Sequence, residues 1–257
     1  MPTRTSATPG APTWIDLTTS DAEGARRFYT ELFGWTAAEA DEQYGGYFMF
    51  FSGDAPVAGC APGDSGDVWA VYLATDDVEK TVASAAAEGG TVLVPPMPIG
   101  DVGTMACVVD PSGAVVGAWQ PGSFFGFPAY AETGKPAWWE LHTRDYAAVL
   151  PFYRTVFGWE TQSMGDTDEF RYSVLQIGDL QAAGVMDASG FLAEGEPSHW
   201  SVYIAVDDAD AVQTRATELG GSVVAPAQDT PYGRLAEIAD PTGARIRLLG
   251  PNREQAA

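Results

Sequence analysis

The sequence predicts an α+β protein of four βαβββ modules, arranged as two tandem copies of one domain. Residues 14–35 return as residues 138–159 without a gap, and nine of these 22 positions are identical. A match at so long a period indicates fused domains rather than a solenoid of short repeats. A WxVYxAxDD stretch, a Gly-Gly pair and an Asp-Pro-Ser/Thr-Gly turn also occur twice, in the same order. Each copy therefore contains two modules.

The first module begins with residues 14–18, where large and polar residues alternate as in a strand. A helix follows, with Ser20 or Asp21 as its N-cap and Gly34 as its C-terminal cap. The apolar residues at helical spacing are Ala25, Phe28, Tyr29, Leu32 and Phe33. Short strands at 47–52 and 56–61 complete the module.

The second module opens with a strand at 69–75 and a helix that ends at Gly89-Gly90. Strands are expected at 91–94, 104–109 and 114–120. The last two are joined by an Asp-Pro-Ser-Gly sequence at 110–113, which suits a type I turn. The second copy repeats this order.

The stretch between the copies is rich in Gly and Pro but contains three phenylalanines. A free linker would not expose these rings, so we expect it to pack across both copies. The expected division is a flexible tail at 1–12, a first domain at 13–122, a packed linker at 123–136, a second domain at 137–251 and a tail at 252–257.

Composition excludes several classes of function. The 35 acidic and 13 basic residues give a net charge of −22, which repels phosphate backbones and anionic lipids. We therefore expect a small-molecule ligand as the partner, with no nucleic acid and no membrane. The internal pseudo-dimer predicts a monomer or a weak homodimer. Cys60 and Cys107 lie among small apolar residues as buried thiols do, and no secretory signal is present, so a cytoplasmic location is expected.

These motifs resemble those of the vicinal oxygen chelate superfamily, which includes glyoxalase I, bleomycin-resistance proteins, fosfomycin-resistance enzymes and extradiol dioxygenases. The resemblance rests on a strand, then D-x6-FY-x3-FGW, and a DP-[ST]-G turn near the end of each copy. It covers nearly the whole chain outside the tails and linker, and it is closest to the tandem glyoxalase-like subgroup of actinobacteria. The resemblance implies curved sheets that form half-barrel cavities, with helices outside.

Metal-dependent members of this superfamily bind a divalent ion through His, Glu or Gln at inward strand positions. Counting from the motifs places these positions at residues that are not usual ligands, namely Trp14, Gly59, Ala70 and Gly117 in the first copy and Trp138, Gly184, Ser201 and Arg247 in the second. We therefore expect no metal and no other cofactor. A new metal site from Glu140, His142 and His199 is disfavoured, because residues two apart on one strand rarely converge on one ion.

The inward faces still carry polar residues, which strand alternation identifies. The predicted catalytic residues are Glu140, His142, Tyr203 and Arg247. The predicted ligand-binding residues are Trp14, Asp16, Tyr72, Trp119, Trp138, His199, Ser201 and Arg245. Glu140 with His142 or Tyr203 would transfer protons, and Arg247 would hold an oxyanion in place of the metal. Alternatively, both histidines are structural and Glu140 forms a buried ion pair with Arg247.

The expected function is metal-independent binding of a small aromatic or polyketide-like metabolite, with acid–base chemistry in the second domain. As an enzyme, the protein would be a lyase, an isomerase or a hydroxylase-like tailoring enzyme. Two alternatives stay open: pure sequestration, as in antibiotic resistance, and a glyoxalase-type lyase in aldehyde detoxification. Sequestration alone would predict two similar apolar pockets, whereas the polar residues gather in the second copy.

Overall fold

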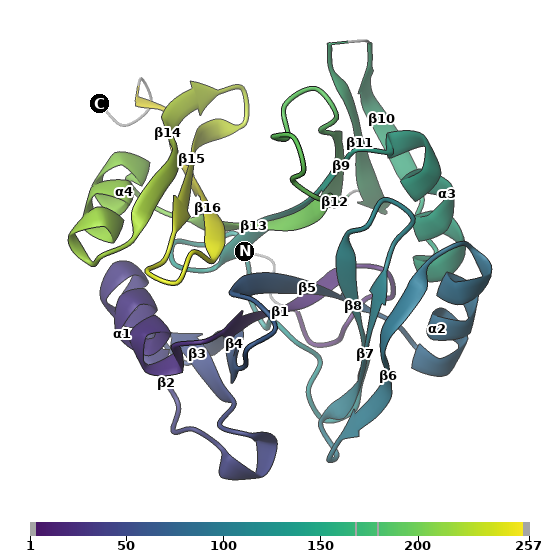
Figure 1. Ribbon diagram of the computed structural model, residues 1–257, viewed down its shortest axis with the longest axis horizontal. Helices are drawn as coiled ribbons and strands as arrows, with labels where there is room; N and C mark the ends of the chain where they lie inside the picture. Colours follow the sequence, from purple (N-terminus) through teal and green to yellow (C-terminus); the bar gives the residue numbers. More distant parts are fainter. Residues whose placement is uncertain (1–3, 168, 179, 254–257) are drawn as a thin grey trace.

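Two eight-stranded mixed sheets and four helices make up the computed structural model, which describes residues 4–167, 169–178 and 180–253 (Figure 1). The first sheet has the order β2-β3-β4-β1-β5-β8-β7-β6, and the second has the order β10-β11-β12-β9-β13-β16-β15-β14. Each sheet comes from one copy, so the two modules of a copy pair with each other. The predicted fold class is confirmed. None of the described helices is long and apolar enough to cross a membrane.

The first copy contains β1 (Pro12–Thr19), α1 (Ala22–Phe33), β2 (Thr36–Ala37), a 3₁₀ turn (Glu42–Tyr44), β3 (Phe48–Ser52), β4 (Ala55–Pro62), β5 (Val68–Ala74), α2 (Val78–Ala87), β6 (Thr91–Ile99), β7 (Gly103–Val109) and β8 (Val115–Pro121). The second copy contains β9 (Pro136–Thr143), α3 (Tyr146–Phe157), β10 (Thr161–Asp166), β11 (Arg171–Ile177), β12 (Leu180–Asp187), β13 (His199–Ala205), α4 (Ala209–Glu218), β14 (Ser222–Thr230), β15 (Gly233–Ala239) and β16 (Arg245–Gly250).

The first helix of each copy begins and ends through the same residue types. Asp21 is the N-cap of α1, and its side chain accepts a hydrogen bond from the Gly24 amide. Gly34 ends α1 in the left-handed conformation, with φ of 68°. Asp145 and Gly158 act in the same way on α3. Strand β6 runs five residues beyond its predicted end, through three prolines, which is possible because β6 lies at the edge of its sheet.

Strand register places the counted positions on one face of each sheet. In the first copy Asp16 is opposite Gly59 on β4 and Ala70 on β5, while Tyr72 is opposite Trp14 and Gly117. Directly opposite residues share a face. The second copy repeats this arrangement, with Glu140 opposite Gly184 and Ser201, and Tyr203 opposite Trp138 and Arg247. We call these the inner faces.

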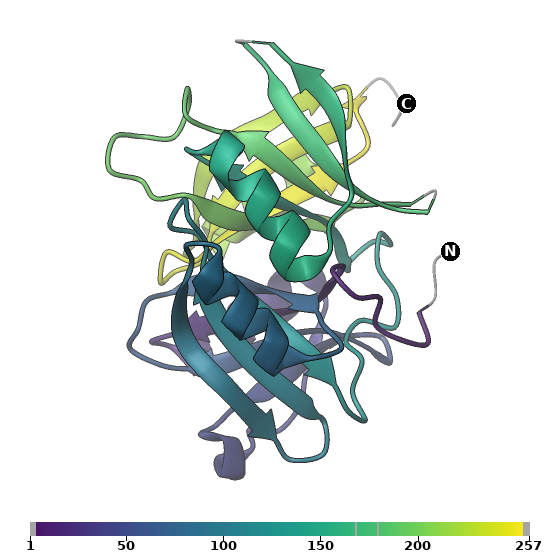
Figure 2. The same cartoon turned by 90° about the vertical axis from the view of Figure 1, so that its right-hand side faces the viewer.

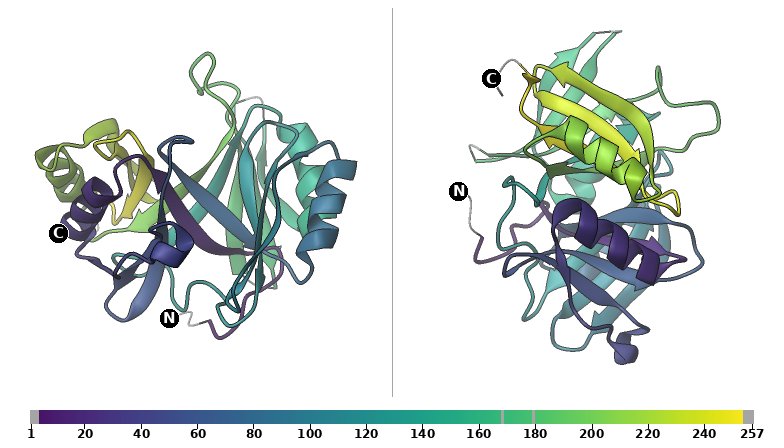
Figure 3. Two further views of the ribbon diagram at one scale, coloured as in Figure 1. Left: turned by 60° about the horizontal axis from the view of Figure 1, so that its bottom comes forward. Right: turned by 90° about the vertical axis from the view of Figure 1, so that its left-hand side faces the viewer.

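The two copies pack through helices that lie side by side, α2 with α3 and α1 with α4 (Figures 2 and 3). The Tyr29 hydroxyl on α1 donates to Asp240 of the second copy at 3.0 Å, and Trp69 Nε1 donates to the same hydroxyl at 3.0 Å. The reciprocal bonds join Tyr153 to Asp110 and Trp200 to Tyr153, both at 3.0 Å. The repeated Phe-Tyr, WxVY and Asp-Pro motifs therefore meet at the interface.

The repeated Gly-Gly pairs also belong to this interface. A Cβ atom on Gly90 would lie 2.9 Å from the Phe152 ring, and one on Gly221 would lie 2.9 Å from the Phe28 ring. Each glycine thus leaves room for the phenylalanine of the opposite Phe-Tyr pair. The sequence indicated only a helix end at these positions.

The linker lies on the first sheet. Thr13 donates through its hydroxyl to the Phe125 carbonyl at 2.6 Å and accepts from the Phe127 amide at 3.0 Å. Phe127 is fully buried, with its ring centroid 5.2 Å from that of Trp14 and 5.5 Å from that of Trp139 in the second copy. The linker thus contacts both copies. Of the predicted tails, residues 1–3 and 254–257 lie outside the described residues.

We predict that Tyr29→Phe lowers the free energy of unfolding by about 2 kcal/mol, because it leaves both buried Asp240 Oδ2 and Trp69 Nε1 without a partner. Tyr153→Phe should have a similar effect, as measured by urea unfolding at neutral pH. The control is Tyr44→Phe at an exposed tyrosine, which should change the free energy by less than about 0.5 kcal/mol. Equal small losses at all three positions would contradict this prediction.

Candidate functional site

A buried carboxylate, Glu140, occupies the centre of the inner face of the second copy. Its Oε1 lies 2.6 Å from His142 Nε2 and accepts a hydrogen bond from the Tyr203 hydroxyl at 2.8 Å. Its Oε2 accepts from the Tyr172 hydroxyl at 2.7 Å. Trp138 Nε1 donates to Tyr172 at 3.1 Å. The structure thus brings together three predicted catalytic residues and adds Tyr172, which the sequence did not indicate.

Glu140 is ionised in this environment. Burial by itself would raise its pKa, but the hydrogen bond and charge of His142 outweigh burial, with the two tyrosine hydroxyls adding to the effect. Together they lower the pKa of Glu140 to about 2. Burial, and next the charge of Glu140, raise the pKa of Tyr172 and of Tyr203, so both hydroxyls keep their protons.

Arg247 joins this cluster from β16. Its Nη2 lies 2.8 Å from Glu237 Oε2, and its Nη1 donates to the Tyr203 hydroxyl at 3.3 Å. Arg247 therefore forms its ion pair with Glu237 and not with Glu140, the partner considered in the sequence analysis. The Tyr203 hydroxyl lies between Arg247 and Glu140, because it accepts from Arg247 and donates to Glu140. Pairing the strands on either side of the Asp-Pro-Thr-Gly turn places Glu237 opposite Arg247, so the sequence did contain this signal.

Two atoms of this cluster are buried without a hydrogen-bond partner among the described residues. They are His142 Nδ1 and Arg247 Nε. Unpaired buried polar atoms are uncommon in folded proteins, and a bound group would account for them. Both atoms belong to residues that the sequence predicts to be catalytic.

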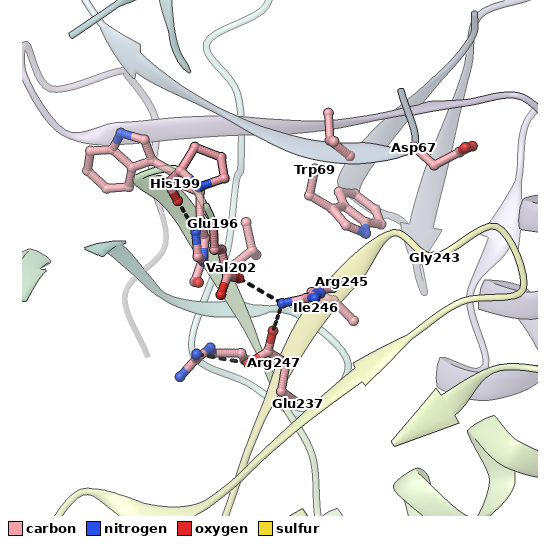
Figure 4. Close-up of a pocket in the computed structure, with 14 residues that line it drawn as sticks. Asp67, Trp69, Glu196, His199, Val202, Glu237, Gly243, Arg245, Ile246 and Arg247 are labelled. Atoms are coloured by element: carbon pink, nitrogen blue, oxygen red, sulfur yellow. Dashed lines mark hydrogen bonds and ion pairs between the residues drawn. The ribbon is translucent and has the colours of Figure 1, made fainter. Parts of the chain in front are cut away.

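A pocket of about 330 Å³ lies beside the cluster, at the junction of the two copies (Figure 4). The first copy contributes Asp67, Val68 and Trp69, and the second contributes Glu196, Pro197, His199, Trp200, Ser201, Val202, Glu237, Gly243, Arg245, Ile246 and Arg247. Of the predicted residues, His199, Ser201, Arg245 and Arg247 line the pocket. Glu140, His142 and Tyr203 are buried and do not line it.

The first copy has a similar cluster around Asp16. Its Oδ1 accepts hydrogen bonds from Trp14 Nε1 and from the Tyr47 hydroxyl, both at 2.9 Å. Burial raises the pKa of Asp16 to about 6, because Thr18 stands where the second copy has His142 and offers no positive charge. The two central carboxyl groups therefore titrate at different pH, so that at pH 4 Asp16 keeps its proton whereas Glu140 is ionised.

The linker covers part of the first inner face. The Phe124 ring packs edge-on against Trp14, with centroids 4.9 Å apart, and lies 6.2 Å from Trp119. Trp119 Nε1 donates to the Phe124 carbonyl at 2.9 Å. The predicted ligand-binding residues of the first copy, Trp14, Asp16, Tyr72 and Trp119, are thus separate from the pocket of the second.

The residues at the positions that the family resemblance assigns to metal ligands do not fit a divalent ion. A Cβ on Gly59 would lie 1.9 Å from the Tyr47 hydroxyl, and one on Gly184 would lie 2.0 Å from the Tyr172 hydroxyl. The tyrosines fill the space that a ligating side chain at these positions would need. Among the described residues, no group of three His, Cys, Asp or Glu side chains is arranged to hold a metal.

Residues 12–117 and 135–248 match the Glyoxalase/Bleomycin resistance protein/Dioxygenase superfamily, and the chain belongs to this superfamily. It is 39% identical over 264 residues to "Putative glyoxylase CFP32" of Mycobacterium tuberculosis, covering 99% of this chain and 100% of that protein. It is 38% identical over 262 residues to "Anthracycline biosynthesis protein DnrV" of Streptomyces peucetius, covering 94% and 93% of the two proteins. The family resemblance seen in the sequence is confirmed.

Solved structures agree on the fold. The Mn(II)-bound glyoxalase from Novosphingobium aromaticivorans superposes with a TM-score of 0.64 at 15% identity, covering 97% of this chain and 86% of that chain. The 2,3-dioxygenase LapB from Pseudomonas sp. KL28 has a TM-score of 0.65 at 15% identity, covering 96% and 93%. At this identity the likeness concerns the fold alone.

We predict that Asp16→Asn stabilises the protein at pH 8 but not at pH 4. Because the pKa of Asp16 is higher in the folded than in the unfolded protein, proton binding by Asp16 favours folding at a pH below the unfolded pKa of about 4. This contribution is lost as the pH rises through about 6. The neutral amide avoids burying a charge, so the free energy of unfolding at pH 8 should rise by up to about 3 kcal/mol. Urea unfolding at both pH values measures the difference.

Glu140→Gln should show the opposite pH dependence. The lowered pKa of Glu140 favours folding above its unfolded value, and this contribution is lost as the pH falls from about 4.5 toward 2. The variant should therefore be less stable than the wild type at pH 8, with a smaller difference at pH 4. The same pH dependence for both variants would contradict the different charge states of the two clusters.

Proposed function

We propose that the second copy binds a small, flat aromatic or polyketide-like ketone without a metal and transfers a proton at the carbon beside its carbonyl. The observation that carries this proposal is the cluster of Glu140, His142, Tyr172 and Tyr203, which lies among the positions that the family resemblance assigns to metal ligands. Metal-dependent relatives stabilise developing negative charge with the ion. Here hydrogen-bond donors and a positive side chain replace it.

The pocket favours a ligand of one or two fused rings. Its volume of about 330 Å³ is at the lower end of the range for small-molecule sites. Trp69, Val68 and Ile246 offer apolar contact, and Arg245 and Arg247 can bind an oxygen of the ligand. The likeness to an anthracycline biosynthesis protein supports an aromatic polyketide as the ligand class.

The polar groups suit proton transfer. Ionised Glu140 accepts the Nε2 hydrogen of His142, and His142 Nδ1 has no hydrogen-bond partner among the described residues. When a proton leaves the carbon beside a ketone, negative charge develops on the carbonyl oxygen. Arg247, whose Nε has no partner among the described residues, is placed at the pocket wall to stabilise that charge.

The test uses 1-tetralone, a bicyclic aromatic ketone, with deuterium exchange in D₂O followed by NMR. We expect wild-type protein treated with a chelator to exchange the protons beside the carbonyl faster than buffer alone. Glu140→Gln should slow this exchange by about 100-fold or more, the usual range for loss of general acid–base catalysis. The control is Glu218→Gln, which removes one exposed acidic group that is not part of the pocket lining.

Exchange that requires an added divalent ion would contradict the metal-free mechanism. Binding of 1-tetralone without exchange would instead support pure sequestration. An unchanged rate in Glu140→Gln would exclude the buried cluster from the reaction.

We also predict one ligand per chain, because Phe124 of the linker packs where a flat ligand would contact Trp14 and Trp119. Isothermal titration with 1-tetralone should give a stoichiometry near one. Two equal sites would contradict this prediction. The pseudo-dimeric packing and the two buried, free cysteines support our further proposal of a monomer in the reducing cytoplasm.

A further inference from the structure

The loop that precedes β13 is six residues longer than its counterpart in the first copy. Residues 63–67 join β4 to β5, whereas residues 188–198 join β12 to β13. This inserted loop supplies Glu196 and Pro197 to the pocket wall. The insertion therefore lies at the site and is absent from the first copy.

Two arginines, Arg144 and Arg245, hold the inserted loop in place. Arg144 donates from Nη2 to the Leu192 carbonyl at 3.1 Å and from Nε to the Glu196 carbonyl at 2.9 Å. Glu196 in turn bonds Arg245 on β16 at 2.9 Å. The first copy has Ser20 in place of Arg144, so the anchor is also specific to the second copy.

The inserted loop fixes the tautomer of His199. His199 Nδ1 lies 3.1 Å from the Pro197 carbonyl oxygen, which can only accept a hydrogen bond. Nδ1 therefore carries the hydrogen, and Nε2 of the neutral ring has a free lone pair. Burial lowers the pKa of His199 below its ordinary value, so the ring is neutral at pH 7.

His199 also contacts the buried cluster. It is opposite His142 in the strand register, and the two rings meet edge to face with centroids 5.3 Å apart. The Phe191 ring, from the inserted loop, packs against the His142 ring, with centroids 5.7 Å apart. In the first copy the two histidines are replaced by Val68 and Thr18. Both histidines of the chain thus lie together beside the pocket, at positions where the first copy has no histidine.

We propose that His199 is the base that contacts the ligand, and that the inserted loop orients it through Pro197. This assignment rests on the proposed function. The carbon–hydrogen bond beside the ketone breaks, its electron pair stays on the ligand as an enolate, and the proton bonds His199 Nε2. The enolate oxygen is held at Arg247, and a solvent deuteron returned to the carbon completes the exchange.

The charged and titratable groups around His199 come from three strands, the inserted loop and the residue before β5. They are His142 on β9, Glu196 in the inserted loop, Glu237 on β15, Arg245 and Arg247 on β16, and Asp67 just before β5. Among these groups Arg245 pairs with Glu196, and Arg247 pairs with Glu237. We therefore expect the pH dependence of the exchange rate to follow the titration of His199.

The first experiment labels histidines with diethyl pyrocarbonate at pH 6.5, a reagent that acylates neutral imidazole. The chain has two histidines, so the count of labels is direct. We expect one label in the wild type, none in His199→Val and one in His142→Thr, and 1-tetralone should protect the wild type. No label, or labelling of His142 alone, would overturn the assignment whether or not the protein exchanges 1-tetralone.

The second experiment measures 1-tetralone exchange. His199→Asn, whose amide can keep the bond to Pro197, should slow exchange by about 100-fold with less than a threefold change in the dissociation constant. It should also remove the wild-type rise in rate with pH below 6.5. Full exchange in this variant, with Glu140→Gln inactive, would overturn His199 but keep the proposed function. Wild-type protein that neither binds nor exchanges 1-tetralone would overturn the proposed function.

Discussion

The structure depends on a hydrogen bond that each copy makes to the other, between the tyrosine of one Phe-Tyr pair and the aspartate of the other Asp-Pro turn. In each aspartate the two oxygens have separate tasks. Asp240 Oδ1 accepts from the amides of Thr242 and Ala244 and so shapes its own turn, while Oδ2 accepts from Tyr29. Asp110 divides its oxygens in the same way. Local turn structure and domain docking are therefore coupled, and the docking brings Trp69 to the pocket of the second copy.

Much of this arrangement could be predicted from sequence, because it depends on short-range patterns. Asp21 and Gly34 act as caps through local hydrogen bonds and backbone conformation, and strand alternation placed Glu140, His142 and Arg247 on one face. Tyr47 and Tyr172 were missed because they reach the carboxylates from strand pairings between distant segments, which no local period encodes. The pairing of Arg247 with Glu237 was missed although both residues flank one hairpin turn, because the opposite positions of its two strands were not compared.

The two copies differ in the pKa of their central carboxyl groups, Asp16 and Glu140. The frame of one carboxyl group, two tyrosines and one tryptophan is kept in both, around Asp16 and around Glu140. Replacing Thr18 by His142 adds one basic ring, and the pKa of the neighbouring carboxyl group changes from raised to lowered. This one position thus separates the pKa values of the two buried carboxyl groups, and at pH 4 only Asp16 keeps its proton.

The covalent linker has a consequence for how such differences could arise. Two identical single-domain chains could dock through the same reciprocal tyrosine–aspartate bonds, but a substitution in one would then appear in both. Once Phe127 and its neighbours join the copies in one chain, each half mutates alone. One half is then free to accumulate polar groups at its site while the other keeps the fold. Gene fusion in this protein therefore breaks the equivalence of two sites that an assembled pair of identical chains would have to share.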